Sequence, residues 1–194
     1  MPLSARSAMR VEPLDASLSR PRQGGPSFSR RNRLYRAVWR LAWLLLAAWT
    51  PPFARRWRRG LLRAFGATMQ GSADVRASAR IWFPRHLTMG DGSVLAGGVT
   101  CYNMATVTIG EGTIVSQGAH LCCGSHELED PHFQLVAKPI RIGRHCWIAA
   151  EAFVGPGVTV GDRAVLGARS VAFADLEAGG VYVGNPARKI RERG

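Results

Sequence analysis

Histidine is the side chain of this sequence best suited to move a proton near neutral pH, because its unperturbed pKa lies near 6.5. A histidine positioned as a general base typically contributes about 10² to 10⁴ in rate. The chain contains five, at His86, His120, His126, His132 and His145. His126 and His132 share one polar stretch, GSHELEDPHF, whereas a surface position is the simpler interpretation of the other three. That stretch is therefore the first candidate for a catalytic site.

The four cysteines are the other side chains that could react. They lie at Cys101, Cys122, Cys123 and Cys146, without a CxxC pair or the cysteine and histidine spacing of a metal site. We expect reduced cysteines in or beside a hydrophobic core, no bound metal and a cytoplasmic protein. Cys122 and Cys123 precede the stretch that contains His126, so a covalent intermediate on a cysteine is the alternative to simple base catalysis.

The C-terminal half of the chain repeats with a period of six residues. A small or aliphatic residue returns at Ile142, Ile148, Val154, Val160, Leu166 and Ala172. This period fits neither a helix nor a single strand and is typical of a β-solenoid, in which each hexad forms one short strand and a turn. The same spacing links positions 69, 75 and 81, then 89, 95 and 101, then 109, 115 and 121.

Grouping these hexads in threes predicts the shape of the solenoid. Five triplets result, and the residues in excess between them number two, two, fifteen and none. If three hexads form one coil of a triangular prism, every insertion leaves the prism at the same corner. We therefore expect about five triangular coils over residues 67–175, with a loop over 122–139. Loops on a rigid scaffold commonly carry functional residues, and this loop contains His126.

The N-terminal third differs in composition from the solenoid. Residues 1–29 show no periodicity and are expected to form a disordered tail, and residues 30–66 are expected to form a helical arm rich in arginine and tryptophan. No acidic residue occurs between Ala16 and Ala73, where twelve arginines lie. The apolar run from Leu41 to Trp49 is shorter than the roughly 20 residues that a membrane span needs.

Two interpretations of the arm remain open. Its apolar face packs under the first coil, because terminal solenoid repeats need a cap, or residues 30–63 lie on an anionic membrane surface, at the inner face of the cytoplasmic membrane. Both can hold at once. Nucleic acid is not an expected partner, since no binding motif accompanies the basic run. Residues 176–194 are expected to form a short basic C-terminal segment.

Three stretches carry a resemblance to a known family: GSHELEDPHF, PIRIGRHCWIAAEAFVGPGVTVGDRAVLGARS and VGNPARKI. They resemble the hexapeptide-repeat O-acetyltransferases, and the chain is most similar to those of colanic acid, or exopolysaccharide, biosynthesis. The resemblance covers roughly Phe28 to Arg193. It implies an all-β fold, a left-handed parallel β-helix, and a homotrimer with sites between subunits. It also implies acetyl-CoA as cosubstrate and a hydroxyl of a sugar or glycan as acceptor.

His126 falls at the position of the family's catalytic histidine and is the expected general base, with His132 as the alternative. The base would remove the proton of the sugar hydroxyl, whose oxygen attacks the acetyl thioester directly, while backbone N–H groups hold the developing oxyanion. The group that orients His126 is left open between a carboxylate of the same loop, such as Asp130, and a backbone carbonyl.

Further matched positions imply where the cosubstrate binds. Trp147 matches an aromatic residue along the cofactor channel, and Ala150 and Ala168 match positions whose backbone contacts the pantetheine arm. Arg188 and Arg191 match basic positions that would pair with the CoA phosphates.

Some positions depart from the family. Phe173 and Ala174 stand where sugar acetyltransferases often carry Thr-Lys, so one phosphate contact is not expected. Ala96 and Met104 replace polar residues that bind the acceptor in galactoside enzymes. The acceptor contacts are expected instead at Tyr102 and Asn103, on the coil before His126.

Two other function classes compete with acetyl transfer. One is a carbonic anhydrase-like zinc site, because the same fold hosts three-histidine sites. Against it, His120 and His126 are one hexad apart and belong on successive faces. The other is a non-catalytic scaffold of a membrane-associated glycan assembly.

Overall fold

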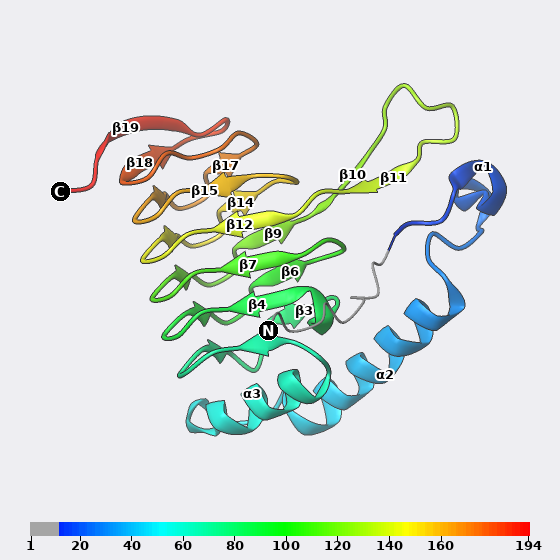
Figure 1. The fold of residues 1–194 in the computed structure, drawn as a ribbon, viewed down its shortest axis with the longest axis horizontal. Coiled ribbons are helices and arrows are strands. Elements are labelled where there is room, and N and C mark those ends of the chain that lie inside the picture. Colours follow the sequence, from blue (N-terminus) through cyan, green and yellow to red (C-terminus); the bar gives the residue numbers. More distant parts are fainter. Residues whose placement is uncertain (1–11) are drawn as a thin grey trace, which may run out of the picture.

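The computed structural model describes residues 12–194. Its main body is a stack of coils in which short strands form three parallel sheets (Figure 1). Sheet A contains β1 (Thr68–Met69), β4 (Leu87–Met89), β7 (Val107–Ile109), β12 (Ile140–Ile142) and β15 (Thr159–Val160). Sheet B contains β2 (Asp74–Val75), β5 (Val94–Leu95), β8 (Ile114–Val115), β13 (Trp147–Ile148), β16 (Val165–Leu166), β18 (Gly180–Val183) and the antiparallel β19 (Arg188–Glu192). Sheet C contains β3 (Arg80–Ile81), β6 (Thr100–Tyr102), β9 (His120–Cys122), β14 (Phe153–Val154) and β17 (Val171–Ala172).

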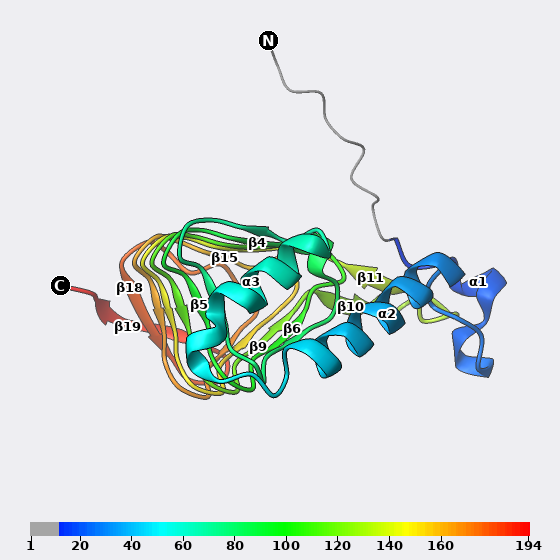
Figure 2. The same cartoon turned by 90° about the horizontal axis from the view of Figure 1, so that it is seen from below.

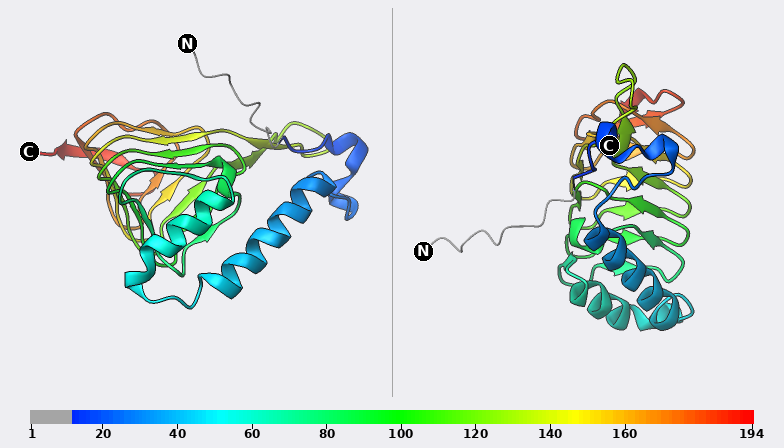
Figure 3. Two further views of the ribbon diagram at one scale, coloured as in Figure 1. Left: turned by 60° about the horizontal axis from the view of Figure 1, so that its bottom comes forward. Right: turned by 90° about the vertical axis from the view of Figure 1, so that its right-hand side faces the viewer.

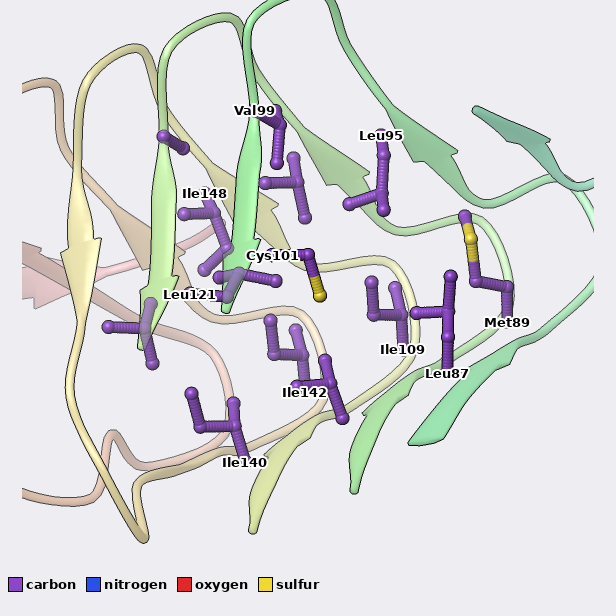
Figure 4. Close-up of a cluster of buried hydrophobic side chains, with 14 of the residues drawn as sticks. Leu87, Met89, Leu95, Val99, Cys101, Ile109, Leu121, Ile140, Ile142 and Ile148 are labelled. Atoms are coloured by element: carbon purple, nitrogen blue, oxygen red, sulfur yellow. The ribbon is translucent and has the colours of Figure 1, made fainter. Parts of the chain in front are cut away.

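The six-residue repeat builds the core of this prism as the sequence predicts. Equivalent positions pair directly from coil to coil, as Met69 with Met89 and Met89 with Ile109. All fifteen predicted repeat positions are buried, at most 6% exposed. Figure 4 shows several of them, including Met89, Leu95 and Ile109, pointing into the prism. At one corner, a Cβ added to Gly110 would lie 2.5 Å from the carbonyl carbon of Gly143 in the next coil, so glycine permits the close stacking. The fold is a left-handed parallel β-helix.

A partial sixth turn follows the five predicted coils. Leu176 bridges to Val160 of sheet A, and Tyr182 of β18 pairs with Leu166 of sheet B. Leu176 follows Val160, and Tyr182 follows Leu166, by sixteen residues, whereas paired residues of the preceding regular coil are eighteen apart. The hexad spacing is lost through this shortening, which is why the sequence predicts a plain C-terminal segment after residue 175. The antiparallel β19 then covers the edge of β18.

The N-terminal arm caps the first coil. It consists of α2 (Arg30–Leu46), a 3₁₀ turn η2 (Pro52–Ala54) and α3 (Arg55–Ala64). Helix α3 lies across the open end of the prism, and α2 runs along its side and beyond it (Figure 2). Trp39 and Leu62 join the hydrophobic core of the prism. The capping interpretation of the arm is therefore confirmed.

The arm also supplies hydrogen-bond donors to the open edge of the first coil. N–H groups of each coil donate to carbonyls of the next, as from Arg76 to Leu95, so carbonyls of the first coil lack a strand partner. Side chains of the arm donate to them: Trp39 Nε1 to Ile81 at 2.7 Å, Trp43 Nε1 to Ala77 at 3.1 Å, Arg58 Nε to Val75 at 2.8 Å and Arg63 Nε to Met69 at 3.0 Å. Arg58 is fully buried and also forms an ion pair with Asp74.

The opposite side of the arm leaves large apolar side chains exposed. Nine of the seventeen exposed large hydrophobic residues in the described part of the chain lie within residues 34–57. We call seven of them the outer face of the arm: Leu34, Val38, Leu41, Leu45, Trp49, Phe53 and Trp57. Leu44 instead lines a groove that also includes residues of sheet C. Within residues 12–194, none of the helices combines the length and the apolar character needed to cross a membrane.

The segment before the arm is more ordered than its composition suggests. Residues 1–11 lie outside the described residues, so the expectation of a disordered tail is not addressed there. Residues 12–29, which the sequence assigns to the same tail, contain α1 (Ala16–Ser19) and the 3₁₀ turn η1 (Pro21–Gln23). Ala16 is buried, and the ring of Phe28 packs at a tilt of 59° against that of Trp82 of the prism. Tertiary contacts stabilise this segment where its local composition does not.

Candidate functional site

The long insertion folds into a β-hairpin that projects from the corner between sheets C and A (Figure 1). Strands β10 (Gly124–His126) and β11 (Leu135–Ala137) pair antiparallel, with His126 opposite Leu135. His126 is the last residue of β10 and is half-buried. The pairing fixes its backbone, while the tip, residues 127–134, turns back over its side chain. A short η3 turn (Pro84–His86) fills the smaller insertion between β3 and β4 at the same corner.

The ring of His126 is held by Phe133. Its Nδ1 lies 2.8 Å from the carbonyl oxygen of Phe133, and the two rings stack with centroids 4.1 Å apart and an interplanar angle of 11°. A carbonyl oxygen can only accept a hydrogen bond, so Nδ1 must carry a proton. In neutral imidazole the lone pair is then on Nε2. This arrangement is suited to a general base that accepts a proton at Nε2.

A backbone carbonyl, one of the two alternatives left open by the sequence, is therefore the group that orients His126. Asp130 has another role: its Oδ1 accepts a hydrogen bond from the backbone N–H of His132 at 2.6 Å and closes the turn at the hairpin tip. Within residues 12–194, no carboxylate hydrogen-bonds to His126. The side chain of His132 is exposed at the tip.

Phe133 adopts an unusual backbone conformation, with φ of +54°. Aromatic residues rarely occupy this left-handed region, and such outliers cost of order 1 to 3 kcal/mol and cluster at functional sites. Here the conformation aims both the carbonyl and the ring of Phe133 at His126. Sequence reasoning did not identify Phe133, since the sequence does not show that one phenylalanine of a polar loop has a positive φ.

The residues expected to bind the cosubstrate lie along sheet B and its corner with sheet C. Trp147 projects from β13, is 49% exposed and donates from Nε1 to Ser116 Oγ at 2.9 Å. Ala150 and Ala168 occupy the same corner in successive coils, where the N–H of Arg169 donates to the carbonyl of Ala150 at 2.9 Å. A small side chain at each position leaves the backbone open to a ligand.

Arg188 and Arg191 lie on β19, beside β18 at the end of the same sheet. Both are exposed, and their guanidinium groups donate only to neighbouring backbone carbonyls, of Ala187 and Glu192. Within residues 12–194 neither arginine pairs with a carboxylate, unlike Lys189 between them, which forms ion pairs with Glu177 and Glu192. Both guanidinium groups could therefore accept an anionic partner.

One protomer does not bring all of these residues together. The hairpin with His126 leaves the prism at the corner between sheets C and A (Figure 3). Trp147 lies on sheet B, and Ala150 and Ala168 lie at the corner between sheets B and C. No hydrogen bond or ring contact in the described structure joins the two groups. A site that uses both would need the hairpin of one protomer beside sheet B of another.

The two residues expected to contact the acceptor differ in their placement. Tyr102 lies on the outer side of β6, in a groove of about 490 Å³ between α2 and sheet C that Arg36, Arg40 and Trp82 also line. Asn103 is a correction: it is fully buried, its Oδ1 accepts from the N–H of Phe83 at 2.9 Å and its Nδ2 donates to the carbonyl of Phe83 at 2.8 Å. Its amide is satisfied within the fold and cannot reach an acceptor.

The cysteines are all free thiols, as expected. Cys101, Cys123 and Cys146 are buried. Burial raises the pKa of the Cys123 thiol to about 12 and that of Cys101 well above its usual value. Both side chains are therefore protonated near neutral pH and poor nucleophiles. Cys122 is half-buried at the foot of the hairpin.

The remaining histidines are dispersed. His120 lies on sheet C with its ring 5.4 Å from that of Phe153, and partial burial lowers its pKa. His126 is on the hairpin instead of the next prism face, so the two histidines belong to different elements. Within the described part of the chain, no group of three His, Cys, Asp or Glu side chains is arranged to hold a metal ion.

Comparison with known proteins adds three findings. Residues 139–172 match the family model described as bacterial transferase hexapeptide (six repeats). The chain is 44% identical over 156 residues to the "Putative colanic acid biosynthesis acetyltransferase WcaF" of Escherichia coli (strain K12), covering 80% of this chain and 86% of that protein. It is 28% identical to the galactoside O-acetyltransferase of the same organism, over 70% of this chain and 68% of that one.

Among solved structures, the chain resembles a hexapeptide-repeat containing acetyltransferase of Vibrio cholerae O1 biovar eltor in complex with acetyl coenzyme A. The two share 25% sequence identity with a TM-score of 0.76, over 86% of this chain and 91% of that one. A match over 86% of this chain extends well beyond residues 139–172, which match the repeat model.

Proposed function

Because this chain belongs to the hexapeptide-repeat acetyltransferase family, we propose that it transfers an acetyl group from acetyl-CoA to a hydroxyl of a sugar in exopolysaccharide or related glycan synthesis. The relative named for colanic acid biosynthesis and the solved acetyltransferase complex with acetyl coenzyme A support this assignment of donor and acceptor. The observation that carries the proposal is the hydrogen bond from His126 Nδ1 to the carbonyl of Phe133, which leaves Nε2 free to accept a proton.

We propose direct transfer with His126 as the general base. Nε2 accepts the proton of the sugar hydroxyl while the hydroxyl oxygen forms a bond to the carbonyl carbon of the thioester. Backbone N–H groups stabilise the negative charge that develops on the carbonyl oxygen. The C–S bond then breaks, and the CoA thiolate leaves and takes the proton from His126. The carbonyl of Phe133 stabilises the imidazolium formed between these steps, because it continues to accept from Nδ1.

The acetyl-CoA site is proposed along sheet B of a neighbouring protomer in a homotrimer. Trp147 would pack along the pantetheine arm, the backbone at Ala150 and Ala168 would hydrogen-bond to it, and Arg188 and Arg191 would bind the phosphates. The separation of these residues from His126 within one protomer supports a site between subunits. Tyr102 and the groove beside α2 are the proposed acceptor side.

We also propose that the arm contacts an anionic membrane surface. Its outer face exposes leucine, tryptophan and phenylalanine side chains, and arginines such as Arg33 and Arg40 flank it. An amphipathic helix with this composition lies in the interface of a bilayer and is attracted by anionic lipids. Such a location would keep the protein on the cytoplasmic face of the membrane.

The test of the proposed function is thiol release from acetyl-CoA by the wild type, His126→Ala and His132→Ala, against sugars, nucleotide sugars and lipid-linked glycan extracts. We expect acceptor-dependent release that falls by at least about 10²-fold in His126→Ala, because the general base is lost. His132→Ala, a matched change in the same loop, should retain activity. Acceptor-dependent release that survives His126→Ala would overturn the role of the base. If the wild type shows neither thiol release with any acceptor nor binding of acetyl-CoA, the protein is a scaffold instead of an enzyme.

A further inference from the structure

Residues 12–23, which precede the arm, contact the tip of the hairpin that carries His126. Helix α1 lies beside this tip although more than 100 residues separate the two in sequence (Figure 3). The contact is made by specific hydrogen bonds and does not belong to the core of the prism. We call residues 12–23 the brace.

Gln134 is the residue that joins the brace to the hairpin. Its Oε1 accepts from the backbone N–H of Ala16 at 2.7 Å, and its Nε2 donates to the carbonyl oxygens of Leu14 at 3.2 Å and Leu135 at 2.9 Å. The side-chain amide thus bonds to both sides of the contact. Gln134 is half-buried, so these bonds are partly shielded from water.

The brace also meets the residue that orients the base. The guanidinium carbon of Arg22 lies 5.9 Å from the ring centroid of Phe133, and Arg22 Nη1 approaches the carbonyl of Pro131 at 3.5 Å. Phe133 precedes Gln134 directly, and its ring, which stacks on that of His126, also lies near the guanidinium of Arg22. Fixing Gln134 therefore fixes the peptide unit between Phe133 and Gln134, and the carbonyl oxygen of that unit accepts the hydrogen bond from His126 Nδ1.

The brace explains how an unfavourable backbone conformation is maintained. Phe133 has a positive φ in an exposed turn, where the chain on its own would favour other conformations. Such a conformation persists when surrounding contacts hold it. The hydrogen bond from Glu127 N to Gln134 O at 2.9 Å and the bonds of Gln134 to the brace supply those contacts on the C-terminal side of Phe133.

We propose that the brace positions the catalytic base: it holds Gln134, which holds Phe133 in the conformation that directs the ring of His126. Gln134 is a positioning residue and does not touch the substrates. This inference rests on the proposed role of His126 as base. It assigns a function to a part of the chain that the sequence suggests is a disordered tail.

The test uses the full-length chain with ¹⁵N-labelled histidine and measures the tautomer of His126 by NMR, a readout that needs no acceptor. Gln134→Met keeps the length of the side chain and removes its hydrogen bonds to the brace. Ala16→Pro removes the donor on the other side and places the ring Cδ where the N–H met Gln134 Oε1, so the contact is broken from the brace. Proline is accepted at the first helical position, and Asp15 before it has a compatible ψ of 118°. Gln70→Met, at an exposed turn of the first coil, is the matched control.

We expect the wild type and Gln70→Met to show one tautomer with the proton on Nδ1, assigned by its loss in His126→Ala. Gln134→Met and Ala16→Pro should show a mixture of both tautomers, and kcat should fall about 10-fold with the KM for acetyl-CoA unchanged. An unchanged tautomer in both brace variants, with circular dichroism showing intact folds, would overturn the brace. That result would leave the role of His126 untouched, because only His126→Ala tests it.

Discussion

Cys122 and Cys123 are the residues that most directly test direct transfer against a covalent intermediate. Burial raises the pKa of the Cys123 thiol to about 12, so the thiol stays protonated at pH 7 to 8. Only a pH near 12 would generate the thiolate. We expect Cys122→Ser/Cys123→Ala to keep acetyl transfer close to the wild-type rate. Thiol release measures the rate, and intact mass spectrometry of the wild type with acetyl-CoA alone should reveal no acetylated protein.

An acetylated wild-type protein that disappears in the double variant would contradict direct transfer. Loss of activity in the double variant with acetyl-CoA binding preserved would do the same. Unchanged binding is the control for folding, since Cys123 is part of the core.

At the residue scale, sequence similarity identifies His126 as the candidate base but not the group that orients its ring. The orienting group is the backbone carbonyl of Phe133, and any residue provides a carbonyl, so side-chain identity conveys nothing about it. Gln134 acts through a contact across 120 residues of sequence. Asn103 shows the opposite error: this polar residue was expected to contact the acceptor, but it is buried and hydrogen-bonds to the backbone of Phe83.

Among the elements, the arm carries the prediction on membranes. The outer face exposes Leu45 to 58%, the same fraction as Ile190 on β19, which provides a matched control. We expect the wild type and Ile190→Glu to sediment with vesicles containing anionic phosphatidylglycerol. Leu45→Glu should bind at least about 10-fold more weakly, because a buried leucine contributes about 1.5 to 3 kcal/mol and a charge opposes insertion.

Lipid composition and salt concentration distinguish the hydrophobic contribution to vesicle binding from the electrostatic contribution. Each arginine near an anionic surface contributes about 1 kcal/mol, so binding should weaken on neutral phosphatidylcholine vesicles and at high ionic strength. Equal binding of Leu45→Glu and the wild type would exclude the outer face as the membrane contact. If neither binds vesicles and Leu45→Glu dissociates the oligomer, the face is an interface between protomers instead.

The arm illustrates what composition can predict about an element. Its helical character and its capping role are predicted from its apolar and basic composition and from the need to cover a terminal coil. Its second apolar side does not follow, because tryptophan and leucine occur all round α2 and only the structure shows that Trp39 is buried while Leu41 and Leu45 are exposed.

For the whole molecule, the separation of His126 from sheet B predicts shared sites. Co-expressed His126→Ala and Arg188→Ala/Arg191→Ala chains should form mixed trimers in which a site has an intact base from one protomer and intact arginines from the next. Random assembly should make about one quarter of the sites competent. Thiol release by the mixed protein, compared with each variant alone, measures this recovery, and size-exclusion chromatography with light scattering verifies the trimer.

If no activity returns in protein shown to contain both chains in one oligomer, each site lies within one protomer. Separately purified variants, mixed without exchange of subunits, provide the control for simple addition of residual activities. Recovery there without exchange would mean that one variant retained activity.

The prism itself was predictable because its repeat is local: each hexad specifies one strand, and all fifteen inward positions are small or apolar. The sixth turn could not be predicted in this way, because it is two residues shorter than a regular coil and its sequence no longer shows the six-residue repeat. The placement of residues 12–29 also escaped prediction, because these residues are ordered by the hairpin and the prism, far away in sequence.

The hydrogen bonds between the arm and the first coil limit how far this solenoid can grow. An uncovered first coil would offer a row of carbonyls that a strand of another molecule could pair with, which is how edge strands seed fibres. Arginine and tryptophan side chains donate hydrogen bonds and accept none, so Trp39, Trp43, Arg58 and Arg63 occupy those carbonyls without offering a new edge. Part of the basic and aromatic character of the arm thus protects the molecule against end-to-end polymerisation.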